Sequence, residues 1–187
     1  MKEALQNRRV KFTIAMLKDA LVESMLDEHI SKISVKSLCD RADINRSTFY
    51  ANFKDQYALL GYIEQEALDN IKRYLEEQDY DDRYPVSFQV LHNILIYVGE
   101  NSDLFKVLLS ENCEQRIQRE VLNLTEVISF QLNSSYSERV KDYLNLYATT
   151  GCISILHKWL QDDKPESTKQ LTEHIMQMLY SGMSSFE

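Results

Sequence analysis

Helix-breaking residues are almost absent from this chain of 187 residues, which holds four glycines and only two prolines, Pro85 and Pro165. A fold of many short strands needs frequent turns, and turns draw heavily on these two residue types. Val and Thr are also few relative to Leu, Glu, Gln and Lys, which favour helices. We therefore predict an all-α protein of about nine helices.

Apolar residues that recur every three or four positions place these helices along the chain. The segment 78–85, acidic, aromatic and ended by Pro85, is the best boundary between them. Polar residues at N-cap positions are expected at Ser34, Asn45 and Ser102, with capping boxes at Ser135–Glu138 and Ser167–Gln170. The predicted helices cover 5–28, 35–42, 46–52, about 54–77, 86–99, 103–110, 113–132, 137–161 and a last stretch through Leu171 to Met183.

The charge of the chain is unevenly divided. Residues 1–54 hold 10 Lys and Arg against 7 Asp and Glu, whereas residues 55–187 hold 11 against 22. The net charge is therefore +3 in the first part and −11 in the second, within a total of −8. This division suggests that the basic first part of the chain faces a polyanion, while the rest forms an acidic domain.

Other features limit the classes of protein to consider. The first residues are polar and do not form a signal peptide, and no apolar run is long enough to span a bilayer. The three widely spaced cysteines are no disulfide framework, so we expect a cytoplasmic protein. The sequence lacks the glycine-rich phosphate loops and nucleophile motifs of common enzymes, and we expect neither catalysis nor a cofactor.

A metal site is the most specific alternative to an organic effector pocket in residues 55–187. Its candidate ligands are His92, Cys113, Cys152, His157 and His174. No two of them stand three or four residues apart, so a site would need side chains from several helices to converge. Dispersed structural residues are the simpler interpretation, and no metal ligand is assigned.

Residues 46–53 have an unusual pattern for so short a segment. On a helix, Phe49 and Phe53 share one face, while Ser47 and Ala51 lie on the opposite face. A helix that enters the major groove of DNA needs such a design, because small outward residues let its backbone approach the base edges. Together with the helix predicted over 35–42 and the break at 43–45, this pattern predicts a helix-turn-helix.

The segment from about residue 8 to 60 resembles the DNA-binding domain of TetR/AcrR-type transcriptional regulators. The matching positions are Ser34-Val35-Lys36-Ser37-Leu38, Ala42-Asp43-Ile44-Asn45 at the turn, and Arg46 to Phe53 in the recognition helix. Two positions depart from the familiar pattern: Asp43 replaces the turn glycine, and Gln56 replaces a lysine that contacts phosphate. Asp tolerates left-handed backbone, so the turn should survive. Gln56 cannot make the lysine's charged contact with phosphate, and Lys54 is expected to replace it in part.

The resemblance implies a set of residues that face DNA. Tyr50 is expected to hold a phosphate, and Arg46, Ser47 and Thr48 to lie where base-edge contacts concentrate. The resemblance also implies a DNA-binding domain at 1–54 and a domain at 55–187 for dimerisation and effector binding. The expected DNA-facing residues are Val35, Lys36, Arg46, Ser47, Thr48, Tyr50, Asn52 and Lys54.

Proteins of this family pair as homodimers through their last two long helices. The segment 137–161 agrees, because it carries more apolar surface than one small bundle can hide, and Gly151 would let another helix approach closely. Gly151, Trp159-Leu160 and Pro165-Glu166 also resemble the branch that includes dihydroxyacetone-kinase operon regulators. An aromatic set is the candidate lining of an effector pocket: Phe88, His92, Tyr97, Phe105, Tyr147 and Trp159.

The sequence therefore predicts a dimeric, cytoplasmic repressor that binds a palindromic operator and is released by a small-molecule effector. A metal-responsive regulator remains an alternative. So does a TetR-like adaptor or coactivator that acts through a protein partner, because Gln56 and the acidic total permit it.

Overall fold

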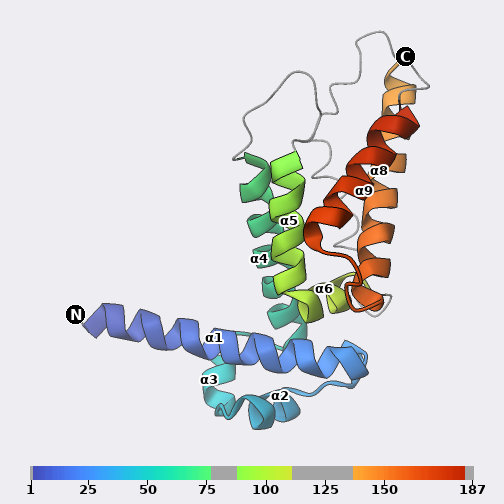
Figure 1. Cartoon of the computed structure of the whole chain (residues 1–187). Coiled ribbons are helices and arrows are strands. Elements are labelled where there is room, and N and C mark those ends of the chain that lie inside the picture. The colour runs from blue at the N-terminus through green and yellow to red at the C-terminus, as the bar shows by residue number, and fades with distance from the viewer. Residues whose placement is uncertain (1, 77–87, 111–136, 184–187) are drawn as a thin grey trace.

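The computed structural model describes residues 2–76, 88–110 and 137–183, and in these residues it is helical throughout, without a strand. Eight α-helices and one short 3-10 helix make up the described part, as the scarcity of Gly and Pro predicts (Figure 1). The helices are α1 (Lys2–Asp27), η1 (Ile30–Lys32), α2 (Val35–Ala42), α3 (Arg46–Tyr50), α4 (Gln56–Glu76), α5 (Phe88–Glu100), α6 (Ser102–Leu108), α8 (Glu138–Gln161) and α9 (Thr168–Met183).

Most predicted helix bounds agree with the structure to within a few residues. The helix over 35–42 agrees at both ends, and the capping box of α9 forms, with mutual hydrogen bonds between Ser167 and Gln170. The predicted helix over 113–132 and the boundary at 78–85 lie outside the described residues.

Two predicted details of the helix ends are wrong. Helix α6 begins at Ser102 itself, so its N-cap is Asn101, whose side-chain amide instead donates to the carbonyl of Tyr97. Helix α8 begins at Glu138 with Ser137 at the N-cap, which places Glu138 too early in the helix for the predicted box. The N-cap position predicted for Asn45 is confirmed at the start of α3, although its side chain makes no capping hydrogen bond.

Helices α1, α2 and α3, called the head below, lie together below the upright helices, with α1 crossing the lower end of α4 and running beneath α6 (Figure 1). Helices α4, α5, α6, α8 and α9 are called the body. Within it, α5 packs on both α4 and α9, while the short α6 packs on α8 and on α1.

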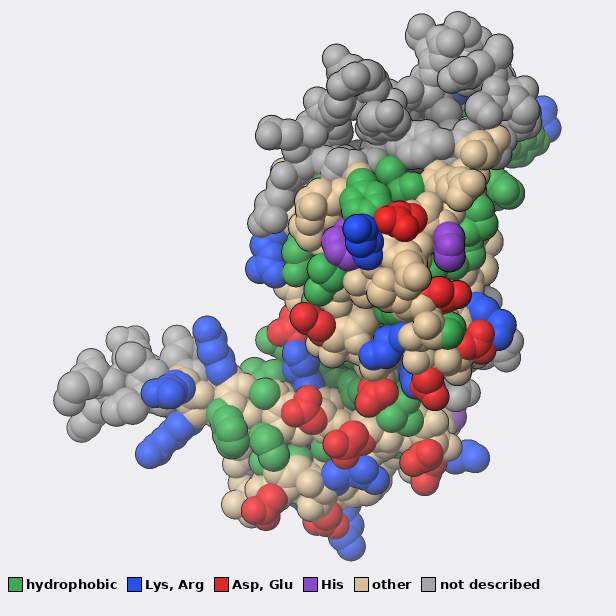
Figure 2. Space-filling model, viewed as in Figure 1, with side chains coloured by type: hydrophobic (Ala, Val, Ile, Leu, Met, Phe, Trp, Pro, Cys, Tyr) green, Lys and Arg blue, Asp and Glu red, His purple; other side chains and the backbone are tan. Residues whose placement is uncertain are grey.

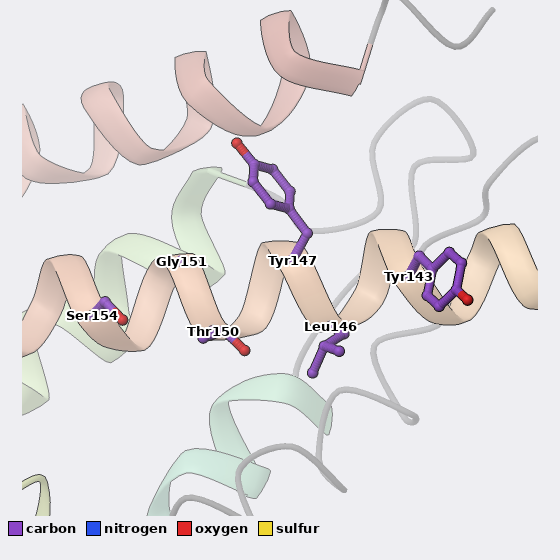
Figure 3. Close-up of a pocket in the computed structure, with 6 residues that line it drawn as sticks. All are labelled: Tyr143, Leu146, Tyr147, Thr150, Gly151 and Ser154. Atoms are coloured by element: carbon purple, nitrogen blue, oxygen red, sulfur yellow. The ribbon is translucent and has the colours of Figure 1, made fainter.

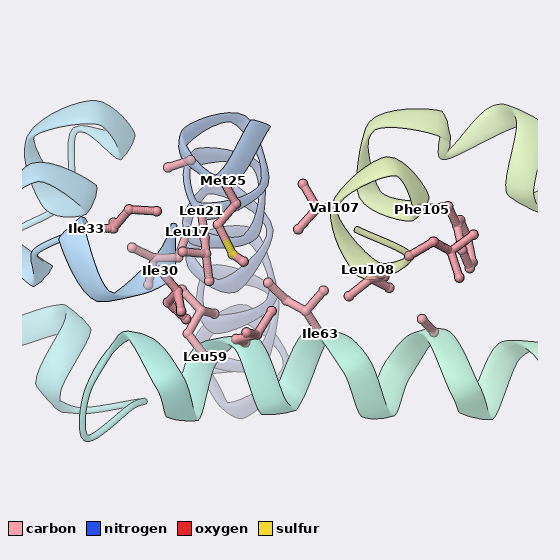
Figure 4. Close-up of a cluster of buried hydrophobic side chains, with 14 of the residues drawn as sticks. Leu17, Leu21, Met25, Ile30, Ile33, Leu59, Ile63, Phe105, Val107 and Leu108 are labelled. Atoms are coloured by element: carbon pink, nitrogen blue, oxygen red, sulfur yellow. The ribbon is translucent and has the colours of Figure 1, made fainter. Parts of the chain in front are cut away.

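One hydrophobic core joins the head to the body. Leu17 and Leu21, four residues apart on α1, are fully buried and face Leu59 and Ile63 of α4 (Figure 4). Leu108 of α6 belongs to the same cluster. Burial of such side chains stabilises a fold by about 1.5–3 kcal/mol each. The position of α3, whose Phe49 belongs to the same cluster, is therefore tied to the body through shared apolar packing.

Candidate nucleic-acid interface

The first helix of the helix-turn-helix is held at its start by a reciprocal cap. The hydroxyl of Ser34 accepts a hydrogen bond from the backbone N–H of Ser37 at 3.0 Å, and the hydroxyl of Ser37 accepts one from the N–H of Ser34 at 3.1 Å. Two N–H groups are thereby satisfied, and the first turn of α2 is anchored. Val35 is half-buried and Lys36 is exposed in this first turn, where a cation and the helix dipole both favour a phosphate.

Asp43 makes the turn between the two helices. Its φ of 52° and ψ of 46° lie in the left-handed region, as the replacement of the turn glycine requires. The N–H groups of Asp43 and Ile44 both donate to the carbonyl of Cys39, which closes the end of α2. Asp is among the few residues other than glycine that adopt this conformation routinely, so the turn forms without glycine.

Helix α3 has one buried face, and that face is aromatic. Phe49 is fully buried and Phe53 is 9% exposed, and their ring centroids lie 6.0 Å apart. Phe53 also packs on Tyr62 of α4 at 5.6 Å. The face that the sequence pattern gives to the two phenylalanines is therefore the buried one, and this anchor fixes the orientation of the short helix.

The opposite side of α3 is exposed and polar. Arg46 and Ser47 are exposed and Thr48 is half-buried. The side-chain amide of Asn52 donates to the carbonyl of Thr48 at 2.8 Å. Tyr50 is 58% exposed, with its ring set edge-on to Phe49 at a centroid distance of 5.6 Å. A small polar face edged by a guanidinium and a phenol is thus presented outward.

The segment between α3 and α4 places a further cation beside this face. Lys54 is exposed, and the carboxylate of Asp55 accepts a hydrogen bond from the N–H of Ala58 at 2.8 Å, which caps α4. Gln56, which stands where the familiar pattern has lysine, is the half-buried first residue of α4. The eight predicted DNA-facing residues thus lie on two short helices and the connection that follows the second.

The thiol within the helix-turn-helix is shielded. Burial raises the pKa of the Cys39 thiol above its ordinary value, and the guanidinium of Arg46 opposes this rise. At neutral pH the thiol is therefore protonated, and Cys39 acts as a small apolar residue of the head core.

The six candidates for the lining of an effector pocket form two pairs and two separate residues. Tyr97 and Phe105 pack edge-on at 5.5 Å, and the side-chain amide of Asn70 donates to the Tyr97 hydroxyl at 3.0 Å. Burial raises the pKa of Tyr97. Phe88 stacks on His92, and Nδ1 of His92 lies 3.2 Å from the hydroxyl of Thr172 on α9.

The other two candidates lie apart on α8. Trp159 is 4% exposed, and its indole N–H donates to the carbonyl of Glu166 at 3.0 Å. It also packs so closely against Gly99 that a Cβ there would lie 3.2 Å from its ring. Tyr147, by contrast, is 63% exposed. The structure therefore does not gather the six side chains around one pocket.

Two polar side chains on α8 were missed by the sequence analysis. Oδ1 of Asn145 and the hydroxyl of Thr149 are buried and have no hydrogen-bond partner among the described residues. Buried polar atoms without partners are costly and call for an explanation. Their spacing of four residues, beside the buried Leu144 and Ala148, is the sequence signal that could have identified them.

The outward side of α8 carries an exposed, largely apolar stripe. Tyr143, Leu146 and Tyr147 are 57%, 55% and 63% exposed. A Cβ added to Gly151 would meet nothing within 4 Å, so the approach of another helix is open there. The stripe lies along a single helix (Figure 3) and consists of Tyr143, Leu146, Tyr147, Thr150, Gly151 and Ser154.

The histidines and cysteines of the metal hypothesis are not brought together in the described part of the chain. No group of three or more His, Cys, Asp or Glu suited to a metal occurs there, and Cys113 lies outside it. His157 contacts Gln161 one turn on, at 3.2 Å, and His92 contacts Thr172 as described above. None of the helices in the described ranges has the length and apolar character needed to cross a bilayer.

Comparison with known proteins gives a family match over half of the chain. Residues 86–181 match the family model TetR_C_8, described as a transcriptional regulator C-terminal region. A curated relative is YxbF of Bacillus subtilis (strain 168), described as an HTH-type transcriptional regulator and 19% identical over 172 residues. The match covers 88% of this chain and 44% of YxbF, so the chain spans less than half the length of that relative.

Solved structures share the fold. The dihydroxyacetone kinase operon activator DhaS has a TM-score of 0.62 at 21% identity, over 94% of this chain and 98% of its own. A TetR transcriptional regulator from Streptococcus agalactiae 2603V has a TM-score of 0.67 at 18% identity, over 95% and 98%. The regulator FadR from Bacillus subtilis, solved with stearoyl-CoA, has a TM-score of 0.67 at 16% identity, over 90% and 98%.

Proposed function

The chain belongs to the TetR-type transcriptional regulators, and from this membership we propose that it is a cytoplasmic repressor that binds a palindromic operator as a homodimer. Residues 1–54 act as the DNA-binding domain in this proposal. Residues 55–187 dimerise and bind an effector.

The observation that carries the proposal is the two-sided construction of α3. Phe49 and Phe53 anchor one side in the core, while Ser47 and Thr48 leave the other side low enough for its backbone to approach base edges. In our proposal the phosphates around this face are contacted by the phenol of Tyr50 and the ammonium groups of Lys36 and Lys54, which positions the helix in the groove. Arg46 lies with Ser47 and Thr48 where base-edge contacts concentrate, and Val35 and Asn52 complete the DNA-facing set.

Pairing through α8 and α9 is supported by the exposed stripe on α8. The sequence analysis expected surplus apolar surface on this helix, and the structure divides it. Leu144, Ala148 and Leu160 are buried within the chain, whereas Tyr143 and Tyr147 are exposed. A second copy that packed here would bury the exposed part around a two-fold axis. Tyr147→Asp should then separate the dimer in sedimentation velocity experiments, and an unchanged sedimentation coefficient would refute this interface.

An effector site inside the body is supported by the unpartnered atoms of Asn145 and Thr149. A ligand with a hydrogen-bond donor would satisfy the amide oxygen of Asn145, and the hydroxyl of Thr149 can either donate or accept. FadR of Bacillus subtilis was solved with stearoyl-CoA, so a regulator of this fold accommodates a small organic molecule. We propose that such a ligand contacts these two residues and aromatic members of the predicted set.

Selection of random double-stranded DNA on the purified protein at moderate salt tests the main proposal. Enrichment of a palindrome is the expected result, and Tyr50→Ala should weaken binding to every sequence while dimer and fold persist. A transcription assay on the selected site then gives the sign of regulation, since DhaS is described as an activator. No enrichment from a folded dimer would refute DNA binding in the effector-free state.

The second candidate is an adaptor that acts through a protein partner. Gln56 in place of lysine and the net charge of −8 favour it. The two functions differ in the salt dependence of DNA affinity. A DNA-binding regulator loses affinity steeply as salt rises, because each phosphate contact releases counterions, whereas an adaptor shows no such slope.

A further inference from the structure

The N-terminal half of α1 projects from the part of the molecule that the structure describes (Figure 1). The buried positions of α1 begin at Leu17, and no residue before Ile14 belongs to the core cluster of the described residues. Figure 1 shows this part of α1 extending past α3 into open space. At 1.5 Å per residue, the span from Lys2 to Thr13 is about 18 Å long. Residues 2–13 are called the α1 arm below.

The arm is basic. Arg8, Arg9 and Lys11 are exposed, and none of them forms an ion pair with a described residue. The arm holds one acidic residue, Glu3, against four Lys and Arg. On the face drawn in Figure 2, the described side chains of the projection include Lys and Arg but no Asp or Glu. Lys18, where packing begins, is instead paired with Glu66 of α4.

The arm also exposes apolar surface between its cations. Phe12 is 67% exposed and Val10 is 38% exposed. Arg8, Arg9, Phe12 and Thr13 line a shallow depression on this single helix. The arm continues the packed half of α1, so its helical order propagates from that half, while its cations and its apolar side chains Val10 and Phe12 stay exposed.

We infer that the α1 arm lies along duplex DNA that flanks the operator half-site and contacts its phosphates. The inference rests on the proposed function, since it extends the footprint of the helix-turn-helix. The arm belongs to the head, whose net charge is positive, and it points past α3 rather than over the acidic body. Charge complementarity therefore selects a polyanion. With a rise of about 3.4 Å per base pair, the arm spans roughly five base pairs beyond the half-site.

The test compares Arg8→Ala/Lys11→Ala with Lys72→Ala/Arg73→Ala, which removes the same two kinds of charge from the exposed side of α4. Fluorescence anisotropy measures the affinity of each protein for two DNAs: the selected operator with long flanks, and the same operator trimmed to its half-sites. Arg8→Lys/Lys11→Arg, which keeps both charges, serves as the conservative variant.

The arm variant should bind the flanked operator roughly 10- to 100-fold more weakly than wild type at low salt, and the trimmed operator about equally. The slope of log Kd against log salt should fall by about 0.9 for each phosphate that the variant no longer binds, or about 3.6 for four phosphates in a dimer. The α4 variant and the conservative variant should match wild type on both DNAs.

Equal affinities of the arm variant and wild type for the flanked operator would overturn the inference. An equal loss of affinity on both DNAs would also overturn it. A change in self-association of the free protein would overturn it too, because the arm would then contact a second copy of this chain. If wild type binds neither DNA, the proposed function itself is wrong, and the inference falls with it.

Discussion

The head and the body are both helical, but they differ in how far apart in the sequence their defining contacts lie. In the head, the cap of α2 joins Ser34 to Ser37, and the core of α3 joins Phe49 to Phe53. In the body, His92 meets Thr172 across 80 positions, and Tyr97 meets Asn70 across 27. A local pattern can therefore describe the recognition surface, whereas the interior of the body depends on which helices meet.

The largest expected effect is a difference in stability between alanine variants of two neighbouring residues of α3. Phe49→Ala should lower the free energy of unfolding by about 3–5 kcal/mol, because it removes a fully buried aromatic ring. Tyr50→Ala should change it by less than about 0.5 kcal/mol, because that ring is mainly exposed. Urea denaturation measures both values. Similar losses for the two variants would contradict the two-sided construction of the helix.

The next prediction concerns the pH dependence of stability that arises from a buried thiol of the body. Burial raises the pKa of the Cys152 thiol from 9.0 to about 11, so the folded state holds this proton more tightly than the unfolded state. The resulting stability is fully present below pH 9 and is lost as the pH rises from about 9 to about 11. Its upper limit is about 3 kcal/mol, at about 1.36 kcal/mol per pKa unit.

Cys152→Ser provides the comparison, because its hydroxyl does not titrate in this range. The difference in unfolding free energy between wild type and variant should be smaller at about pH 10.5 than at about pH 8, since only the thiol titrates between them. A constant difference would show that the thiol is not shielded in the folded body.

Matched serine caps compare the two regions directly. Ser34→Ala in the head and Ser167→Ala in the body each remove a side chain that accepts from the N3 backbone N–H, so each should cost about 1 kcal/mol. Both variants should unfold in a single transition, because one hydrophobic cluster joins the two regions. Two transitions in calorimetry of either variant would break that conclusion. Only Ser34→Ala should also weaken DNA binding.

The smallest effect concerns residues with positive φ. Asp43→Gly should stabilise the turn of the helix-turn-helix by up to about 1 kcal/mol, because glycine adopts the left-handed conformation without a steric cost. Asp163, just after α8, has a φ of 56°, but its carboxylate also accepts a hydrogen bond from Lys106 at 2.9 Å. Asp163→Gly should therefore gain less than Asp43→Gly in thermal melts, and an equal gain would mean that the contact with Lys106 contributes nothing.

In the head, the sequence predicted most structural features at the level of single residues. The bounds of α2, the left-handed Asp43 and the buried Phe49 and Phe53 all follow from interactions within about five residues, which periodicity and capping rules describe. In the body the same rules located the helices and the capping box of α9, but they erred at the N-caps of α6 and α8. Asn101 precedes Ser102, and Ser137 replaces Ser135, because several polar residues in a row offer alternative caps.

The candidate sites show the same division. The eight residues predicted to face DNA lie together because they belong to two short helices joined by one turn and to the connection after them. The six predicted pocket residues of the body do not lie together, because their side chains point to different surroundings. Trp159 packs on Gly99, Phe105 packs on Tyr97, and Tyr147 is exposed. Asn145 and Thr149 became noticeable only when the structure placed them inside the body without partners among the described residues.

The sequence by itself determined the helical class, the helix-turn-helix and the two-sided helix α3, because 3.6-residue periodicity, capping and turn chemistry act over a few neighbouring residues. Only the tertiary structure decided which part of α8 is buried and which is exposed, where the unpartnered polar atoms of the described residues lie, and that the basic start of α1 extends beyond the core. Those properties depend on packing between helices far apart in the chain, and the pattern of a single helix does not contain them.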